Sequence, residues 1–187
     1  MNLLTTAPPL SAEVGGAEYP INPDFRNILT INKILTEKDV EGVPEALSRF
    51  YVEGVPGDIE GAIEAFIEFF AAGEEAKGGN GSKVEVIDFE HDADYIFAAF
   101  YYEYKINLAE VSTMHWWIFR SLFAGLKHSK INDIINIRAT EISKDMSASE
   151  KKYYLKMKRL FALPKKEKKL SQLEQALLSG GSLEGLV

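Results

Sequence analysis

Aromatic side chains are concentrated in one short part of this chain. The block from Asp88 to Leu126 holds 11 of the 21 aromatic residues in 39 of the 187 residues. From Tyr95 to Tyr104 every residue except Glu103 is apolar or aromatic, so apolar side chains cover the whole circumference of a helix there. Such a helix must be buried on all sides or shared with another chain. We therefore expect the fold to be centred on this block.

The composition favours a mainly α fold: a compact multi-helix domain with a small amino-terminal β-hairpin or small sheet. A length of 187 residues with 46% hydrophobic residues suffices for a real core. Cysteine is absent, which excludes disulfides, thiolate metal sites and cysteine nucleophiles. The amino terminus has neither a basic start nor a long apolar segment, and no apolar run approaches the roughly 20 residues that cross a bilayer. We expect a cytosolic protein without a membrane partner.

We predict five segments along the chain. Residues 1–22 form an amino-terminal arm and β-hairpin, 23–72 the amino-terminal helices, 73–83 a Gly-rich linker, 84–162 an aromatic-rich helical core, and 163–187 a basic, flexible carboxyl-terminal tail. In the first segment Gly15-Gly16 separates two short strands, because glycine readily takes the positive φ values of a two-residue hairpin turn. The glycines and small polar residues of the linker disfavour both helix and strand.

Helix start and stop signals place the remaining elements. The predicted helices are residues 24–37, 45–52, 58–72, one through Tyr95–Tyr104, one from Ser112 to Leu126, one that starts near Ser129, and one from Ser147 to about Ala162. Asp92 and Ser112 are the predicted N-caps of the fourth and fifth helices. Ser147 and Glu150 have the spacing of a capping box. Residues 84–87 are a predicted short strand.

The helix at 58–72 has the clearest amphipathic pattern. Its predicted apolar face consists of Ile59, Ala62, Ile63, Phe66, Ile67 and Phe70. On the other side Glu60, Glu64 and Glu68 repeat every four residues with no lysine between them, which weakens a helix by roughly a few tenths of a kcal/mol per pair. The row is either an ordinary solvated face or a docking stripe for a basic segment, from this chain or from a partner.

Two tryptophans lie on opposite sides of the helix that ends at Leu126. Trp116 is on the predicted inner arc, whereas Trp117 falls beside small residues, among them Gly125, that permit close approach of another backbone. Either the chain's own core or another subunit covers this second face, and the sequence leaves both open.

Charge is polarised along the sequence, whose formal net charge is -7. Residues 37–94 contain 16 acidic against 4 basic residues, whereas residues 150–170 contain 9 basic against 2 acidic ones. On the last predicted helix Lys152, Lys156 and Arg159 form a basic row. Basic segments can bind nucleic acid, but the acidic remainder opposes that approach and no aromatic residues are interleaved among the last lysines. We therefore favour a solvated basic helix or a protein contact.

An acidic cluster opens the aromatic block. It comprises Asp88, Glu90, His91, Asp92 and Asp94, with His115 within reach if the next helix packs antiparallel. A two-metal site in a helical bundle needs Glu-x-x-His on two helices, and the calcium-loop pattern is absent. Acids at a helix start also complement the helix dipole. With no Gly-x-Ser-x-Gly elbow, no nucleophile has an identifiable base. The sequence therefore favours no metal, no cofactor and no catalytic residue, and we interpret His115 as a core or boundary residue.

A series of short motifs spans residues 10 to 162. In chain order they are Glu13-Val14-Gly15-Gly16, Tyr19-Pro20-Ile21, Asp24-Phe25-Arg26, Asp88-Phe89-Glu90, Asp92-Ala93, Ile96, Ala98-Ala99-Phe100, His115-Trp116-Trp117, Phe119-Arg120, Leu122, Gly125-Leu126, Arg138, and Lys151 to Lys158 with Tyr153 and Tyr154. Their order and spacing resemble the bacteriophage gene-product-fifteen family. The linker and the tail lie outside the resemblance.

The resemblance implies a non-enzymatic protein of tailed phages or prophages of Gram-positive hosts, encoded among the tail genes and located in the host cytoplasm. Members are taken as tail assembly chaperones, which keep the tape-measure protein soluble and help to recruit tail-tube subunits. No catalytic residues are implied. A structural tail or neck component of the virion is the alternative, and a small helical enzyme or metal-binding protein is a second one. A homo-oligomer is compatible with each.

Helix-in-groove recognition of a partner is the mechanism that we expect. The candidate protein-binding residues are the acidic row Glu60, Glu64 and Glu68, the basic row Lys152, Lys156 and Arg159, and the aromatic anchors Phe70, Tyr101, Tyr104 and Trp117.

Overall fold

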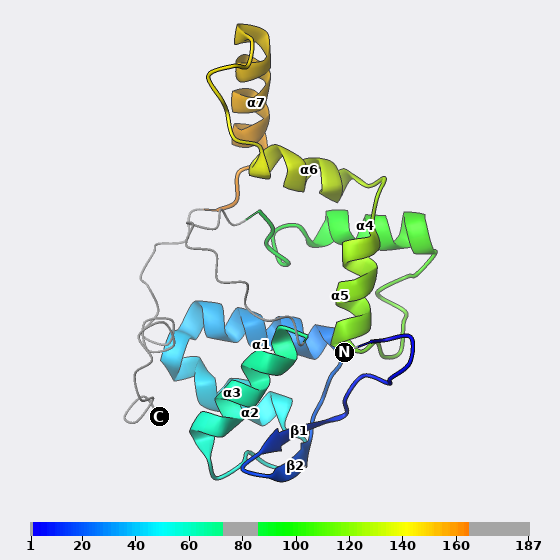
Figure 1. Ribbon diagram of the computed structural model, residues 1–187, viewed down its shortest axis with the longest axis vertical. Helices are drawn as coiled ribbons and strands as arrows, with labels where there is room; N and C mark the ends of the chain where they lie inside the picture. Colours follow the sequence, from blue (N-terminus) through cyan, green and yellow to red (C-terminus); the bar gives the residue numbers. More distant parts are fainter. Residues whose placement is uncertain (1, 73–85, 165–187) are drawn as a thin grey trace. The chain divides into compact units, whose positions relative to one another are not determined.

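The computed structural model describes residues 2–72 and 86–164 (Figure 1). The described chain forms two compact units, which we call unit 1 (residues 2–72 and 113–120) and unit 2 (residues 86–112 and 121–164). Helix α5, Trp116–Gly125, contributes its first half to unit 1 and its second half to unit 2. The predicted linker and the predicted tail from residue 165 onward lie outside the described residues.

Unit 1 begins with the predicted β-hairpin. Strand β1, Ser11–Val14, pairs antiparallel with β2, Ala17–Pro20. Gly15 and Gly16 have φ values of +59° and +81°, so both positions need the conformation that glycine adopts without strain. The prediction of a mainly α fold with a small amino-terminal sheet is confirmed.

Three helices follow in unit 1: α1 (Phe25–Lys38), α2 (Val43–Phe50) and α3 (Ile59–Phe70). A short 3-10 turn, Asp39–Gly42, joins α1 to α2. The carboxylate of Asp58 caps α3 by accepting a hydrogen bond of 3.0 Å from the backbone N–H of Gly61. The predicted positions of all three helices are confirmed, with ends that differ by about two residues.

The buried face of α3 is turned by one position from the predicted one. Phe69 is buried, whereas Ile67, which we had placed on the buried side, has an exposed fraction of 37%. The rings of Phe66 and Phe69 both pack against Phe50 of α2, with centroid distances of 5.1 and 5.3 Å. Contact with Phe50 therefore sets the rotation of α3, which periodicity alone could not determine.

Tyr51 ties the elements of unit 1 together. Its backbone pairs with Ile21 after β2, and its hydroxyl donates a hydrogen bond of 2.9 Å to the carbonyl oxygen of Ala62 in α3. Burial, with a smaller contribution from Tyr19, raises the pKa of Tyr51 to about 12, so the hydroxyl keeps its proton.

Unit 2 contains α4 (Ala93–Tyr104), the second half of α5, α6 (Lys130–Ala139) and α7 (Ala148–Leu160). The predicted capping box at the start of α7 is confirmed: Ser147 accepts from the backbone N–H of Glu150, whose side chain accepts from the backbone N–H of Ser147. None of the helices in the described residues has the length and apolarity needed to cross a membrane.

A buried ion pair lies at the centre of unit 2. Asp92 is fully buried, and its two carboxylate oxygens accept hydrogen bonds of 2.6 and 2.9 Å from the guanidinium of Arg138. Arg138 also donates through Nε to the carbonyl oxygen of Phe161 (2.7 Å) and through a terminal nitrogen to that of Val86 (3.1 Å). One side chain therefore joins the start of α4, the segment before it and the end of α7.

The prediction that Asp92 caps α4 with its side chain is wrong. Although Asp92 occupies the N-cap position, its carboxylate makes no cap hydrogen bond because Arg138 binds it. Asp88 instead accepts from the backbone N–H groups of Glu90 and His91, both at 2.9 Å, and so stabilises the turn before the helix.

Two further boundaries were predicted wrongly. Helix α5 starts at Trp116, four residues after its predicted cap, because the intervening segment pairs with the start of α1 through a backbone bridge between Asp24 and His115. Of the predicted strand at 84–87, residues 86 and 87 have no strand structure, and the other two lie outside the described residues.

We expect loss of the Asp92 carboxylate to destabilise unit 2 strongly. In Asp92→Ala the Arg138 guanidinium stays buried without its counter-ion, which costs about 3–5 kcal/mol. Urea unfolding followed by circular dichroism measures the loss. Asp145→Ala, at an exposed loop position, is the control and should change the free energy of unfolding by less than about 0.5 kcal/mol. A loss for Asp92→Ala no larger than that of the control would contradict a central role for the pair.

Candidate protein-binding surfaces

His115 caps the first turn of α5. Its Nδ1 accepts a hydrogen bond of 3.0 Å from the backbone N–H of Trp117, and its Nε2 lies 2.9 Å from the carbonyl oxygen of Pro9. Because Nδ1 accepts, Nε2 carries the proton of the neutral imidazole and donates it to Pro9. Burial lowers the pKa of His115, against a smaller opposite effect of the Pro9 contact, and favours this neutral form. His115 therefore has a structural role within unit 1.

The two tryptophans and Arg120 complete the carboxyl end of α3. The last carbonyl groups of a helix have no partners within it. Trp117 Nε1 donates to the carbonyl oxygen of Phe69 at 2.7 Å, and Trp116 Nε1 donates to that of Phe70 at 2.9 Å. Arg120 donates to the same Phe70 oxygen at 3.2 Å, where its positive charge also suits the helix dipole.

This capping decides the alternatives for Trp117. Its exposed fraction is 9%, and its ring stacks on that of Phe69 with a centroid distance of 5.6 Å. The chain's own unit 1 thus covers Trp117, which leaves little of its ring exposed for the partner contact that we predicted. Phe70, a second predicted anchor, is half-buried and stacks on Trp116 at 5.2 Å.

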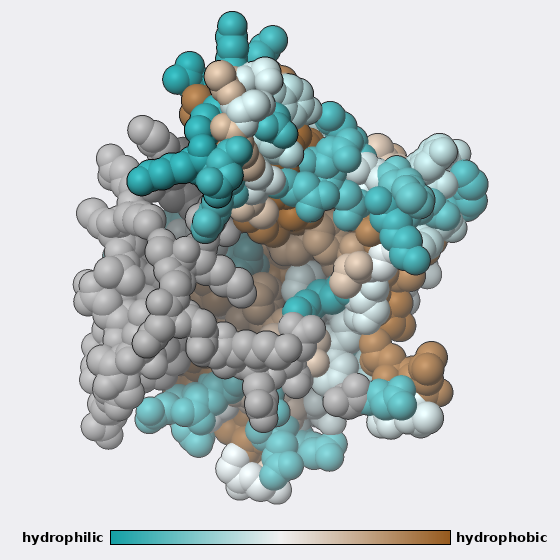
Figure 2. Space-filling view, turned by 45° about the horizontal axis from the view of Figure 1, so that its top comes forward, coloured by the Kyte–Doolittle hydropathy of each residue, from teal (hydrophilic) through white to brown (hydrophobic). Residues whose placement is uncertain are grey.

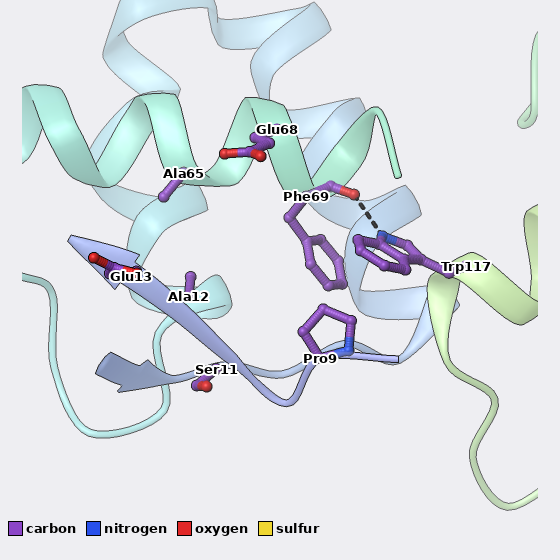
Figure 3. Close-up of a pocket in the computed structure, with 8 residues that line it drawn as sticks. All are labelled: Pro9, Ser11, Ala12, Glu13, Ala65, Glu68, Phe69 and Trp117. Carbon is purple, nitrogen blue, oxygen red and sulfur yellow. Dashed lines mark hydrogen bonds between the residues drawn. The ribbon is translucent and has the colours of Figure 1, made fainter. Parts of the chain in front are cut away.

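A pocket of about 270 Å³ lies between β1 and α3. Its lining residues are Pro9, Ser11, Ala12, Glu13, Ala65, Glu68, Phe69 and Trp117 (Figure 3). The rings of Phe69 and Trp117 lie near Pro9 at one end, Glu13 lies on β1 toward the other, and Glu68 lies on α3 beside Phe69. This volume lies just below the usual range of small-molecule sites, which suits a single side chain better than a cofactor.

The predicted acidic row of α3 is exposed. Glu60, Glu64 and Glu68 all lie on the surface, and the structure describes no hydrogen bond or ion pair for them. The basic residues of unit 1 have partners elsewhere within the described chain: Arg26 pairs with Asp24, Lys33 with Glu37, Lys38 and Arg49 with Glu45, and Arg120 with the Phe70 carbonyl. Unit 1 therefore provides no counter-charge for the row in its described residues.

Helix α4 is exposed over a large part of the surface that we expected to be covered. Its buried residues are Ile96, Ala99 and Phe100. Four aromatic residues remain exposed, and we call them the α4 aromatic surface: Tyr95, Phe97, Tyr101 and Tyr102. The exposed fractions of Tyr101 and Tyr102 are 56% and 68%. The sequence identified Tyr101 but missed the other three, because a helix that is apolar all round does not reveal which side lacks a neighbour.

Tyr104, the fourth predicted anchor, is held within unit 2. Its hydroxyl donates a hydrogen bond of 2.9 Å to the carbonyl oxygen of Leu122. Burial raises the pKa of Tyr104, so the hydroxyl remains a donor. A Cβ atom at Gly125 would lie 2.8 Å from that hydroxyl oxygen, so a side chain there would displace the Tyr104 hydroxyl.

Helix α7 buries none of its residues. The predicted basic row Lys152, Lys156 and Arg159 is exposed, as are Leu155 and Leu160 on the same side. Figure 2 shows hydrophilic residues intermingled with hydrophobic ones at its top, where α7 lies. Only the carboxyl end of the helix has described side-chain contacts with Arg138, including a hydrogen bond of 2.6 Å from Lys158 Nζ to the Arg138 carbonyl.

The acids at the start of the aromatic block do not converge on a site. Arg138 binds Asp92, Asp88 holds a turn, and His115 belongs to unit 1. In the part of the chain that the structure describes, no group of three or more His, Cys, Asp or Glu side chains is placed to hold a metal ion.

Comparison with known proteins identifies the family. The family model described as Bacteriophage Gp15 protein matches residues 5–163 of the 187. The chain therefore belongs to the bacteriophage Gp15 family, as its motifs indicated, and this membership indicates a structural or tail-related phage protein. No curated protein and no solved structure matches the chain.

We expect the stability of unit 1 to fall in acid because of His115. Its pKa in the folded state lies below the ordinary value of 6.5, so the unfolded chain takes up the proton first. The stabilising effect is present above pH 6.5 and is lost as the pH falls through the folded pKa. His115→Asn keeps a side-chain acceptor for the Trp117 N–H but cannot titrate, and should flatten this dependence.

Tryptophan fluorescence during urea unfolding at several pH values measures the effect, since both tryptophans lie in unit 1. His91 and His128 are exposed, so His91→Gln and His128→Gln serve as controls that keep the wild-type dependence. If either control flattens the curve as much as His115→Asn, the assignment to His115 is wrong.

Proposed function

We propose that this protein is a non-enzymatic tail assembly chaperone, which binds the tape-measure protein and assists tail-tube assembly in the host cytoplasm. The observation that carries the proposal is the α4 aromatic surface. Family membership supports the choice of a phage partner. The buried and half-buried polar side chains described above, such as Asp92, Arg138 and His115, form hydrogen bonds that hold the fold. The exposed aromatic rings are therefore the groups that we expect a partner to contact.

The α4 aromatic surface has the composition of a binding site. Tyrosine and phenylalanine are enriched in interfaces, where a few buried aromatic anchors provide most of the binding energy. Three of its four residues are tyrosines, whose hydroxyl groups remain hydrated while their rings offer apolar area. An amphipathic helix of the tape-measure protein could cover these rings along α4.

Co-expression with the tape-measure protein tests the proposal. We expect the wild-type chain to raise the soluble fraction of the tape-measure protein and to co-purify with it. The variant Tyr101→Ser/Tyr102→Ser should lose at least about tenfold in affinity, since a single anchor is commonly worth 1–2 kcal/mol or more. Neither hydroxyl has a described hydrogen bond, and the one described ring contact, of Lys105 with Tyr102, is exposed, so the fold should be retained.

The matched control is Leu10→Ser/Val52→Ser, which removes two apolar side chains of similar exposure from unit 1. It should bind like the wild type. A tape-measure protein that is no more soluble with the wild-type chain, and forms no complex with it, would refute the chaperone function. Recovery of the chain in purified virions would instead favour a structural tail or neck component.

A further inference from the structure

Two helices each leave a charged face without a partner in the described chain. We define the acidic face of α3 as Glu60, Glu64, Ile67 and Glu68. The basic face of α7 comprises Lys152, Leu155, Lys156, Arg159 and Leu160. All nine side chains are exposed, and no hydrogen bond or ion pair is described for the charged ones. Each face therefore has both the charge and the apolar area of a contact that no residue among 2–72 and 86–164 fills.

The glutamates of the acidic face of α3 repel one another, and a bound positive charge would reduce this repulsion. Glutamates at four-residue spacing destabilise a helix slightly when no cation lies between them. Glu13 of β1 adds a further carboxylate to the pocket that Glu68 lines, and it lies directly opposite Glu18 across the hairpin. Like charges in such cross-strand positions are also unfavourable. A basic segment seated here would reduce all of these repulsions.

The basic face of α7 belongs to a helix that lacks packing. Its 13 residues include no buried one, although isolated helices of this length are marginal in water and depend on an apolar face that packs. Leu160 has an exposed fraction of 66%, and Leu155 of 47%. A partner that covers these leucines would stabilise α7 in the conformation seen here.

The two faces match in length. On α3, the acids fall at offsets of 0, 4 and 8 residues from Glu60, with the apolar Ile67 at offset 7. On α7, the bases fall at offsets of 0, 4 and 7 residues from Lys152, with leucines at offsets 3 and 8. At a rise of 1.5 Å per residue, each face is about 12 Å long. Ile67 on one helix and Leu160 on the other supply the apolar contact, and three carboxylates face three cations.

We propose that the basic face of α7 in one copy of this chain binds the acidic face of α3 in a second copy. The end of a lysine or arginine side chain that passes Glu68 would reach the pocket, which Glu13 and Glu68 supply with negative charge (Figure 3). Because the contact joins two different surfaces, it forms a reciprocal dimer or a larger assembly. It does not involve the α4 aromatic surface.

Charge reversal tests this self-association. Light scattering during size-exclusion chromatography should show a mass above the 20.9 kDa of one chain, rising with concentration at low salt. At about 1 M salt, where screening acts within roughly 3 Å, the mass should fall toward that of one chain. Glu60→Lys/Glu64→Lys/Glu68→Lys and Lys152→Glu/Lys156→Glu/Arg159→Glu should each be monomeric. An equimolar mixture of the two variants should associate again.

The matched control is Glu41→Lys/Glu53→Lys, which reverses exposed acids of unit 1 outside α3 and should associate like the wild type. Recovery in the mixture excludes misfolding as the cause of either loss. A wild-type chain that is monomeric at every concentration would overturn the proposal, whether the two faces then meet within one chain or bind the tape-measure protein. Self-association without any tape-measure complex would refute the chaperone function but not this contact.

Discussion

The carboxyl end of α3 sets the structure of unit 1. Its last carbonyl groups lie under aromatic side chains, where each unsatisfied group would cost about 1–3 kcal/mol. The donors come from Trp116, Trp117 and Arg120, more than 45 positions further along the chain. Because these donors bind α3, residues 113–120 belong to unit 1, whereas most of the aromatic block belongs to unit 2. The histidine that caps α5 then fixes the two indoles by holding the first turn against Pro9.

Unit 2 depends in the same way on one side chain. Arg138 presents its N–H groups in a rigid fork, so its four described hydrogen bonds can be made together in only one arrangement of the surrounding segments. A buried ion pair gains little net stability after its desolvation cost. Its value in this unit is geometric, because it places the segment before α4 and the end of α7 against the same residue.

Turn, cap and periodicity patterns within a few residues predicted most of the helices and the hairpin. Contacts between residues far apart in the sequence could not be predicted from such patterns. Gly15-Gly16 and the Ser147 capping box act over a few residues, so their patterns predicted the hairpin and the start of α7. The partnership of Asp92 with Arg138 spans 46 positions, and a carboxylate at a helix start has the same pattern whether it caps the helix or binds a distant cation. The sequence also located the charged rows of α3 and α7 correctly on exposed faces, since their spacing is a local property.

Exposure of aromatic residues was harder to predict because periodicity describes a helix and not its neighbours. Trp117 and Tyr101 were equally good anchors by sequence, yet one completes a helix end and the other lies on the surface. The N–H of an indole or the O–H of a phenol can donate to a buried carbonyl oxygen or to water at the surface. Which of the two occurs depends on whether the fold places a carbonyl oxygen within reach, and helix periodicity does not show that.

The distribution of these surfaces favours weak and separable associations. Single exposed ion pairs are worth about 0–1 kcal/mol, so three of them with two or three aliphatic contacts give reversible binding that salt can weaken. The α4 aromatic surface consists mainly of ring area, with one cation, Lys105, over the ring of Tyr102, and it would bind chiefly through apolar contact, which salt does not screen. A chain with both kinds of surface can associate with its own copies and still release them, while an apolar helix remains bound elsewhere on unit 2.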